Sequence, residues 1–355
     1  MKAHQILKKN HQDNAEDYHA LGKAFIKMEK TKPAESALLK AAQLAPQDIN
    51  VLLTLGNFMR SQQRIRAAAA CYERAISINP SLSELYLNLG SMQSILNETE
   101  SAIFNFQVVC DMDPENMTAK HMLAALQGKT TDVAPEQHIQ NLFNRYSSKF
   151  DTHMVKNLGY CVPDLMVNLL KSTDDTNRVF NNALDLGCGT GLGGMRFRDR
   201  CKRLSGIDLA PQMIEISRIK SIYNALHVGN VLDISDLFKE KFDLFIASDV
   251  LVYIGNLAPL FHSLKKRSSP HALFVFSTES LGGKGYKLRP SGRYAHSKTY
   301  IKTTAGLCGF QCNATISDNL RREKGEWIKG DVWIFIFNTA LQDDPDCQPS
   351  RFFNA

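Results

Sequence analysis

The sequence predicts two folded parts, an N-terminal array of paired α-helices followed by a doubly wound α/β sheet. Glycine, alanine and proline columns that recur every 34 residues predict the helical array. Strand-like and helix-like segments alternate after residue 180, with a glycine-rich stretch behind the first strand, and this alternation predicts the sheet. A length of 355 residues fits two domains better than one.

The repeated segment runs from residue 15 to residue 116. Each unit places a glycine on its first helix, where a missing side chain lets the second helix approach, and a proline after its second helix. The glycines are Gly22, Gly56 and Gly90, and the prolines are Pro46, Pro80 and Pro114. The third unit departs from the first, with Gln93 in place of Phe25 and Val109 in place of Ala41.

These residues resemble tetratricopeptide repeats, a family of helical repeats that bind proteins or peptides on a concave surface. Three units are expected, followed by a helix that caps the last apolar face. Together they define a tetratricopeptide-repeat domain over residues 1–127, with repeats 15–48, 49–82 and 83–116 and a capping helix 117–127.

A polar segment with Gly128 and Pro135 follows, so residues 128–139 are expected to form a linker. The second domain is expected over residues 140–340, beginning with amphipathic helices before the first strand. The polar residues 341–355 are expected to form a flexible tail.

The stretch "LDLGCGTGLGG" admits two readings. Asp185, Gly187, Gly189 and Gly191 give D-x-G-x-G-x-G, whereas a dinucleotide fingerprint G-x-G-x-x-G would start at Gly189. The strand ends near residue 186, so the turn glycine is needed at 187, and the dinucleotide reading starts two residues late. Asp185 also favours a cationic ligand group over a pyrophosphate.

Further polar residues follow the next strands. Asp208 ends the second strand, where its carboxylate can accept hydrogen bonds from both hydroxyls of a ribose. Asn230 and Val231 follow the third strand and are candidates for contact with adenine, and Met213 is a candidate for packing on the ring face. Asn230 is equally consistent with a turn residue.

The segments "ALDLGCGTGLGG", "LSGIDLAPQMIEISR" and "FDLFIASDVLVYIGNLAPLF" resemble class I S-adenosylmethionine-dependent methyltransferases, which have a Rossmann-like sheet. The run from residue 134 to residue 310 resembles a family that joins such a domain to tetratricopeptide repeats. The resemblance implies S-adenosyl-L-methionine as cofactor, bound by Asp185, Gly187, Gly189, Gly191, Asp208, Met213, Asn230 and Val231. A helix before the first strand lids the cofactor cleft in many such enzymes, which makes Tyr146 a further candidate.

Candidate catalytic residues lie where strand ends face the cleft. Methyl transfer depends on alignment rather than on a side-chain triad, although an oxygen or nitrogen acceptor can need a base. Asp249, Tyr253 and His296 are the candidates. Asp249 is equally consistent with a helix cap or backbone anchor, and Tyr253 fits a core position.

The segment "RPSGRYAHS" is the candidate substrate-binding loop. It supplies Arg289, Arg293, Tyr294 and His296, and a guanidinium such as that of Arg293 suits a carboxylate or phosphate. A surface loop with local hydrogen bonds is the alternative.

Composition narrows the function classes. The formal net charge of +6 arises entirely after residue 134, but no nucleic-acid module accompanies the basic runs. Neither a secretory signal nor an apolar run of membrane-spanning length stands out, so a cytoplasmic protein is expected. The eight cysteines lack C-x-x-C spacing, and no metal site is expected.

Together these features predict a methyltransferase acting on a small-molecule or carrier-bound acceptor, with repeats that bind an unidentified protein or peptide. A non-catalytic interaction or scaffold protein with a cofactor pocket is the alternative from another class. An NAD-dependent oxidoreductase is the third reading.

Overall fold

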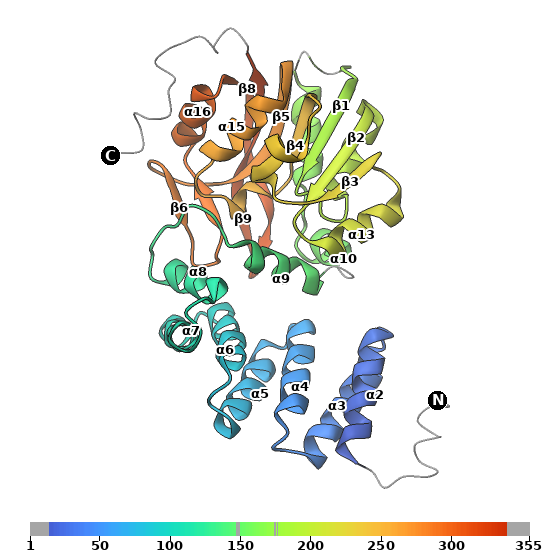
Figure 1. Cartoon of the computed structure of the whole chain (residues 1–355), viewed down its shortest axis with the longest axis vertical. Coiled ribbons are helices and arrows are strands. Elements are labelled where there is room, and N and C mark those ends of the chain that lie inside the picture. Colours follow the sequence, from blue (N-terminus) through green and yellow to red (C-terminus); the bar gives the residue numbers. More distant parts are fainter. Residues whose placement is uncertain (1–13, 147–149, 174, 176, 339–355) are drawn as a thin grey trace. The chain divides into compact units, whose positions relative to one another are not determined.

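The computed structural model describes residues 14–146, 150–173, 175 and 177–338. The chain divides into two compact units, Met1–Gln127 and Gly128–Ala355 (Figure 1). The prediction of a helical array followed by a sheet domain is confirmed, and each unit is built around its own core.

From residue 14 onward, the first unit consists of three helix pairs and a final helix. They are α2 (Ala15–Lys27) with α3 (Thr31–Leu44), α4 (Ile49–Ser61) with α5 (Ile65–Ile78), α6 (Ser83–Ile95) with α7 (Thr99–Met112), and α8 (Met117–Leu126). A Cβ on Gly22 would lie 2.6 Å from Leu38 Cδ2, and one on Gly56 would lie 2.7 Å from the Tyr72 ring. The glycine column is therefore fixed by the close approach of the two helices in a pair.

The third pair replaces an apolar contact by an amide pair. Asn105 Nδ2 donates to Gln93 Oε1 over 2.7 Å, and both side chains are buried. The amides satisfy each other, so the departure at Gln93 costs no unpaired polar group. Val109 is fully buried together with Ala119 of α8, which covers the last repeat.

The second unit is a mixed β-sheet with the strand order β3-β2-β1-β4-β5-β7-β6, to which β9 and β8 are added along β5. The strands are β1 (Phe180–Leu186), β2 (Cys201–Asp208), β3 (Ala225–Val228), β4 (Phe242–Ala247), β5 (Ser268–Ser280), β6 (Tyr286–Leu288), β7 (Tyr294–His296), β8 (Phe310–Glu323) and β9 (Glu326–Phe337). Neighbouring strands from β3 to β5 are parallel, as the sequence predicts.

The antiparallel strands β8 and β9 extend the parallel sheet that the sequence predicts. β9 runs antiparallel to both β5 and β8. β8 and β9 are joined directly at Lys324 and Gly325, which both have positive φ. A hairpin needs no crossover helix, so this pair breaks the strand–helix alternation.

Helices cover both faces of the sheet. The helices are α11 (Val162–Lys171), α12 (Leu192–Phe197), α13 (Pro211–Lys220), α14 (Ile234–Leu237), α15 (Ala258–Arg267) and α16 (Lys298–Leu307). Along β4, Leu244 and Ile246 pack with α11 and α12, whereas Phe245 and Ala247 pack with α14, α15 and α16. The alternation follows from the two-residue period of a strand.

The predicted linker is attached to the sheet unit over part of its length. Ala134 N donates to Tyr253 O over 2.9 Å, and the N–H groups of Gly255 and Asn256 both donate to Asp132 O over 2.8 Å. α9 (Glu136–Tyr146) begins inside the predicted linker range, and α10 (Phe150–Thr152) continues into a π-helix, His153–Asn157. The predicted linker therefore belongs structurally to the second unit, which it contacts from Thr130 onward.

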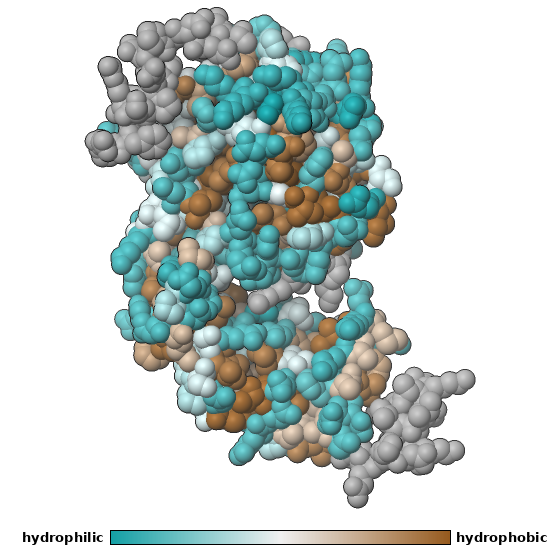
Figure 2. Space-filling model, viewed as in Figure 1, coloured by the Kyte–Doolittle hydropathy of each residue, from teal (hydrophilic) through white to brown (hydrophobic). Residues whose placement is uncertain are grey.

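Hydrophilic residues cover much of the face seen in Figure 2, with apolar residues between them on both units. Exposed apolar side chains of the second unit include Ile219, Val228 and Leu237. In the part of the chain that the structure describes, no helix combines the length and apolar character needed to cross a membrane.

Candidate active site

A cavity of about 320 Å³ lies at the carboxyl ends of β1, β2 and β4. Parallel α/β sheets bind their ligands at this edge. The volume is at the lower end of the range of about 300–1,000 Å³ common for small-molecule sites. Its polar wall includes Glu136, Asp185, Gly187, Gly189, Thr190, Asp208, Asn230, Ser248, Asp249 and Arg293, and its apolar wall includes Ile139, Leu142, Phe143, Phe150, Met154, Leu158 and Tyr253.

The glycine loop after β1 approaches this cavity with little side-chain bulk. Gly187 and Gly189 have positive φ, and a Cβ on Gly187 would lie 2.6 Å from Val250 Cγ2. Gly189 has no atom within 4 Å of its absent Cβ and lines the cavity, so the loop leaves room for a ligand. Gly191 lies beside Ile222 and, unlike its neighbours, does not line the cavity.

Asp185, the second-last residue of β1, has a buried carboxylate. Oδ2 accepts a hydrogen bond from the Tyr223 hydroxyl over 2.6 Å, whereas the buried Oδ1 has no hydrogen-bond partner among the described residues. Burial raises the pKa of Asp185 to about 7, against the opposing effect of the Tyr223 hydroxyl and the Gly194 N–H. An unpaired buried carboxylate oxygen is costly, so this atom is a candidate partner for a cationic group of a ligand.

Tyr223 was not singled out from the sequence, because only the structure relates it to Gly194 of the glycine loop. A Cβ on Gly194 would lie 2.3 Å from the Tyr223 hydroxyl oxygen. The last glycine of the apparent dinucleotide fingerprint therefore makes room for the tyrosine that binds Asp185.

Asp208 is the last residue of β2, and its carboxylate binds the backbone of the glycine loop. Its Oδ2 accepts from Gly189 N and its Oδ1 from Ala210 N, both over 2.8 Å. Burial raises the pKa of Asp208 to about 6, although these two backbone hydrogen bonds lower it. Each carboxylate oxygen keeps a second lone pair, which suits a pair of neighbouring hydroxyl groups.

The residues that follow β3 form a turn and also line the cavity. Asn230 Oδ1 accepts from Leu232 N over 2.9 Å, and Asn230 Nδ2 donates to Glu136 Oε1 over 2.7 Å. Asn230, Val231 and Glu136 all line the cavity. Glu136 was missed because it begins a helix inside the predicted linker.

The segment from α9 to Leu158 forms one side of the cavity. Phe143 contacts Phe150 and Tyr253 edge-on, with ring centroids 6.0 and 5.6 Å apart. Asp151 accepts hydrogen bonds from the Thr190 hydroxyl and from Lys220 Nζ, which ties this segment to the glycine loop and to α13. Tyr146 ends α9, but its side chain lies outside the described residues.

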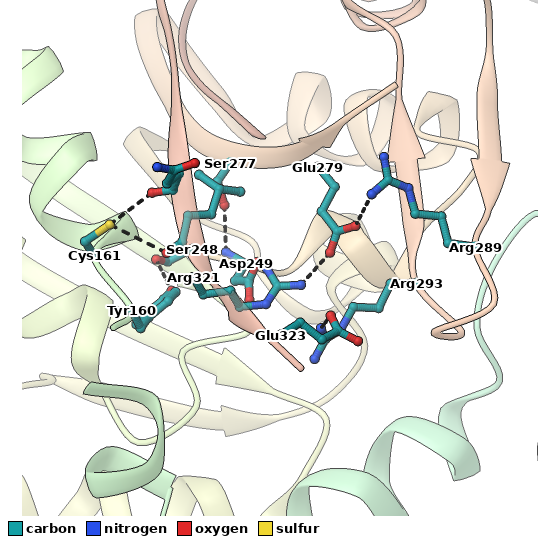
Figure 3. Close-up of polar contacts among 12 residues, drawn as sticks. Tyr160, Cys161, Ser248, Asp249, Ser277, Glu279, Arg289, Arg293, Arg321 and Glu323 are labelled. Atoms are coloured by element: carbon teal, nitrogen blue, oxygen red, sulfur yellow. Dashed lines mark hydrogen bonds and ion pairs between the residues drawn. The ribbon is translucent and has the colours of Figure 1, made fainter. Parts of the chain in front are cut away.

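Asp249 lies after β4 on the cavity wall and is held in an uncommon conformation. Its φ is 63°, and its N–H donates to Ser277 Oγ over 2.9 Å. Asp249 Oδ1 accepts from Arg321 Nη1 over 2.5 Å, and Arg321 also donates to Glu279 (Figure 3). Strained backbone of this kind concentrates at functional sites.

Arg321 could not be assigned from the sequence. It lies on β8, 72 residues from Asp249, and its side chain is 1% exposed. The pairing of β8 with β9, and of β9 with β5, brings the two residues together.

Of the predicted substrate loop, Arg293 lines the cavity and the other three residues do not. Arg289 binds Glu279 and Ser280 O, and Tyr294 is fully buried with its hydroxyl 2.6 Å from Thr131 Oγ1. Short strands form on both sides of the turn, and their pairing directs these side chains into the unit rather than into the cavity.

His296 is corrected as a candidate base. Its Nε2 lies 2.8 Å from Ile254 O and 3.1 Å from Gly255 O, and the side chain is fully buried outside the cavity lining. Burial lowers the pKa of His296 to about 4, although the two carbonyl contacts raise it. The ring is therefore neutral near pH 7 and fixes the turn after β4.

Met213 is likewise corrected as a ring-packing residue. It is fully buried on α13 and does not line the cavity, because the start of the helix directs it inward; Leu209 lines the cavity instead. Among the residues that the structure describes, no three His, Cys, Asp or Glu side chains gather as metal ligands.

Family models match two parts of the chain. A methyltransferase-domain model matches residues 184–276, and a tetratricopeptide-repeat model matches residues 15–48 and 49–82. The first model covers the strands and loops that form the polar wall of the cavity from Asp185 to Tyr253.

Curated relatives match parts of the chain. The malonyl-[acyl-carrier protein] O-methyltransferase of Serratia marcescens is 29% identical over 28% of this chain and 38% of that protein. A ubiquinone biosynthesis O-methyltransferase of Glaesserella parasuis is 25% identical over 45% of this chain and 78% of that protein. The human protein O-mannosyl-transferase TMTC1 is 30% identical over 31% of this chain and 13% of that protein. The chain thus spans well under two thirds of the length of the first and third of these relatives.

Solved structures also match part of the chain. The N-methyltransferase NodS from Bradyrhizobium japonicum WM9, in complex with S-adenosyl-L-homocysteine, has a TM-score of 0.41 and 20% identity. The match covers 49% of this chain and 86% of that one.

Proposed function

This chain carries tetratricopeptide repeats and a methyltransferase domain, and we propose that it transfers a methyl group from S-adenosylmethionine to a small-molecule or carrier-bound acceptor. The observation that carries the proposal is Asp185 Oδ1, a buried carboxylate oxygen on the cavity wall without a hydrogen-bond partner among the described residues. The ammonium group of S-adenosylmethionine supplies the cation that this atom lacks.

The other residues proposed to contact S-adenosylmethionine fit the same ligand. Asp208 would accept the ribose hydroxyls, and the loop at Gly187 and Gly189 would lie against the donor without side-chain clash. Asn230 and Val231 would border the adenine, with the Asn230 amide oriented by Glu136. Gly191 and Met213 would support the loop and α13 from outside the cavity.

A dinucleotide fits this cavity poorly. Four carboxylates line it, from Glu136, Asp185, Asp208 and Asp249, and Arg293 is the one arginine or lysine among the described lining residues. A pyrophosphate placed among these carboxylates would be repelled. The charge on the wall therefore favours a sulfonium donor over NAD.

The chemistry requires alignment more than side-chain participation. When bound, S-adenosylmethionine supplies a methyl carbon activated by a sulfonium. The protein holds the acceptor in line with that carbon and excludes water. Such orientation of the reacting groups can lower the activation barrier by about 7–11 kcal/mol. Asp249 is the candidate for holding the proton that leaves an oxygen or nitrogen acceptor, and Tyr253 would border the acceptor.

Calorimetry with three ligands tests the donor assignment. S-adenosylmethionine and S-adenosylhomocysteine should bind the full-length protein, whereas NAD should give no heat of binding. Binding of NAD in preference to both would contradict the assignment. Transfer of labelled methyl into fractions of a cell extract then tests turnover, and tight donor binding without transfer would favour a non-catalytic scaffold.

We also propose that the repeats bind a protein or peptide that presents the acceptor. A groove on α5, α6 and α7 is lined by Glu73, Tyr86, Glu100 and Phe104, and the Phe104 side chain is 65% exposed. Affinity capture with the wild type and with Phe104→Glu tests this, because the variant should lose its partner and keep S-adenosylhomocysteine binding.

The described cysteines are free thiols, which supports a cytoplasmic location.

A further inference from the structure

The part of the cavity where the methyl acceptor would bind has two opposite charges on one wall and three aromatic rings on another. Asp249 and Arg293 supply the charges, and Phe143, Phe150 and Tyr253 supply the rings. From this arrangement we infer that the methyl acceptor is a small amphipathic carboxylic acid that bears a hydroxyl or amine. The inference rests on the proposed function and names the class of its acceptor.

Arg293 has hydrogen-bonding capacity left for a ligand. Its Nη1 donates to Glu323 Oε2 over 2.7 Å, and this is the one side-chain hydrogen bond that it makes within the described residues. A guanidinium has five N–H donors in a planar fork that fits a carboxylate. A carboxylate can therefore bind Arg293 beside Glu323.

Asp249 has the complementary capacity. Oδ1 is bound by Arg321, and no described residue donates to Oδ2. Arg321 bridges Asp249 and Glu279, Arg289 also binds Glu279, and of these four residues Asp249 alone lines the cavity (Figure 3). The wall therefore offers an acceptor atom at Asp249 for a hydroxyl or amine, and donor atoms at Arg293 for a carboxylate.

The sheet order separates Arg293 from the donor's own carboxylate. Arg293 directly precedes β7, and β4 and β5 lie between β7 and β1. Three strand spacings of about 4.8 Å place β7 about 14 Å from β1. The ammonium and carboxylate of S-adenosylmethionine share one carbon atom, so a donor paired with Asp185 keeps its carboxylate close to β1.

The transfer step balances with these residues. The lone pair of the hydroxyl oxygen or amine nitrogen forms a bond to the methyl carbon, and the electrons of the C–S bond return to sulfur, giving S-adenosylhomocysteine. The proton leaves the acceptor through its hydrogen bond to Asp249. Phe143, Phe150 and Tyr253 pack on the apolar body and keep water from the reacting atoms.

The test uses matched pairs of an acid and its amide on the full-length protein saturated with S-adenosylhomocysteine. The pairs are 3-(4-hydroxyphenyl)propionate with its amide, and 8-hydroxyoctanoate with its amide. Ligand-observed NMR and calorimetry should show at least one acid binding about tenfold tighter than its amide, a difference of about 1.4 kcal/mol. Arg293→Met should abolish this preference.

Two further variants distinguish ligand binding from a structural role. Glu323→Gln removes the charge that competes for Arg293, so it should strengthen acid binding and leave amide binding unchanged. Arg196→Met, at an exposed ion pair with Asp164, is the matched control and should keep the wild-type preference.

Three results would overturn the inference. They are amides that bind as well as both acids, an Arg293→Met variant that keeps the preference, and acids that do not bind at all. A loss of S-adenosylhomocysteine affinity in Arg293→Met would also overturn it, by assigning Arg293 to the donor. Titration of the wild-type protein with S-adenosylhomocysteine alone tests the proposed function. A failure of that function is therefore distinguishable from a failure of this inference.

Discussion

The Tyr223 hydroxyl lies 2.6 Å from Asp185 Oδ2, in the space that the absent side chain of Gly194 leaves open. This contact orients the carboxylate and leaves Oδ1 buried on the cavity wall. Donor binding and the stability of the ligand-free protein are therefore expected to depend on Asp185 in opposite directions.

Asp185→Asn should weaken S-adenosylhomocysteine binding about 10- to 100-fold, because a hydrogen bond to a charged group contributes about 1.5–3 kcal/mol. Calorimetry at pH 8 measures this change. The amide can still accept from Tyr223, so the fold is kept, and an unchanged affinity would contradict the role of Asp185 in binding the ammonium.

The same variant should raise the stability of the ligand-free protein at pH 8. Burial raises the pKa of Asp185 from 3.8 to about 7, so the folded state holds a proton that the unfolded state releases. Stability therefore falls as pH rises from about 4 to about 7, and above that window Asn removes a penalty on the order of 4 kcal/mol. Denaturant unfolding at pH 4 and pH 8 should show the gain at pH 8 alone.

Donor affinity should rise with pH through the neutral range, as Asp185 and Asp208 lose their protons. Tyr223→Phe removes a hydrogen bond that lowers the pKa of Asp185, so the midpoint of this rise should move to higher pH. Calorimetry of S-adenosylhomocysteine from pH 5.5 to 9 follows the midpoint. A midpoint that stays in place would show that Tyr223 does not tune Asp185.

Arg321→Met should destabilise the protein by about 3–5 kcal/mol, because it leaves Asp249 without its buried cation and Glu279 with the partly exposed Arg289 alone. Adding Glu279→Gln should recover part of this loss. The adjacent Arg322→Met is the matched control, since Arg322 is exposed over the Trp327 ring and its loss should cost at most about 1 kcal/mol. Equal losses in the two single variants would contradict a buried network.

Within the repeats, alanine should be tolerated unequally along the glycine column. Gly56→Ala would place Cβ 2.7 Å from the fully buried Tyr72 ring and should cost about 1–3 kcal/mol. Gly90→Ala meets its nearest atom at 3.2 Å, and the gain of about 1 kcal/mol in helix propensity should offset that contact. Chemical unfolding of the two variants compares them, and similar losses would argue against packing as the cause.

Local patterns predicted the fold well because each element has a strong period of its own. The glycine column predicted helix pairs, and the apolar runs predicted the parallel strands from β1 to β5. The antiparallel β8 and β9 were not foreseen, because the pairing of β9 with β5 is set by the whole sheet.

The sequence predicted those site residues that lie at or directly after the end of a strand. Asp185, Gly187, Gly189, Asp208 and Asn230 all lie on the cavity wall, and their binding roles stay predictions. Arg321 and Glu136 come from distant segments, and the sequence contains no local signal for their placement. His296 was misplaced because its ring binds backbone carbonyls rather than the cavity.

The attachment of Asp132 and Ala134 to Tyr253, Gly255 and Asn256 also determines where the chain can be divided. A recombinant fragment that starts at Gln140, the predicted domain start, would lack Val133, Ala134, Glu136 and Ile139 from the cavity wall. Such a fragment would have a ligand site open on one side. Cleavage near Gly128, by a protease or in a designed gene, would release the repeats and leave that wall intact.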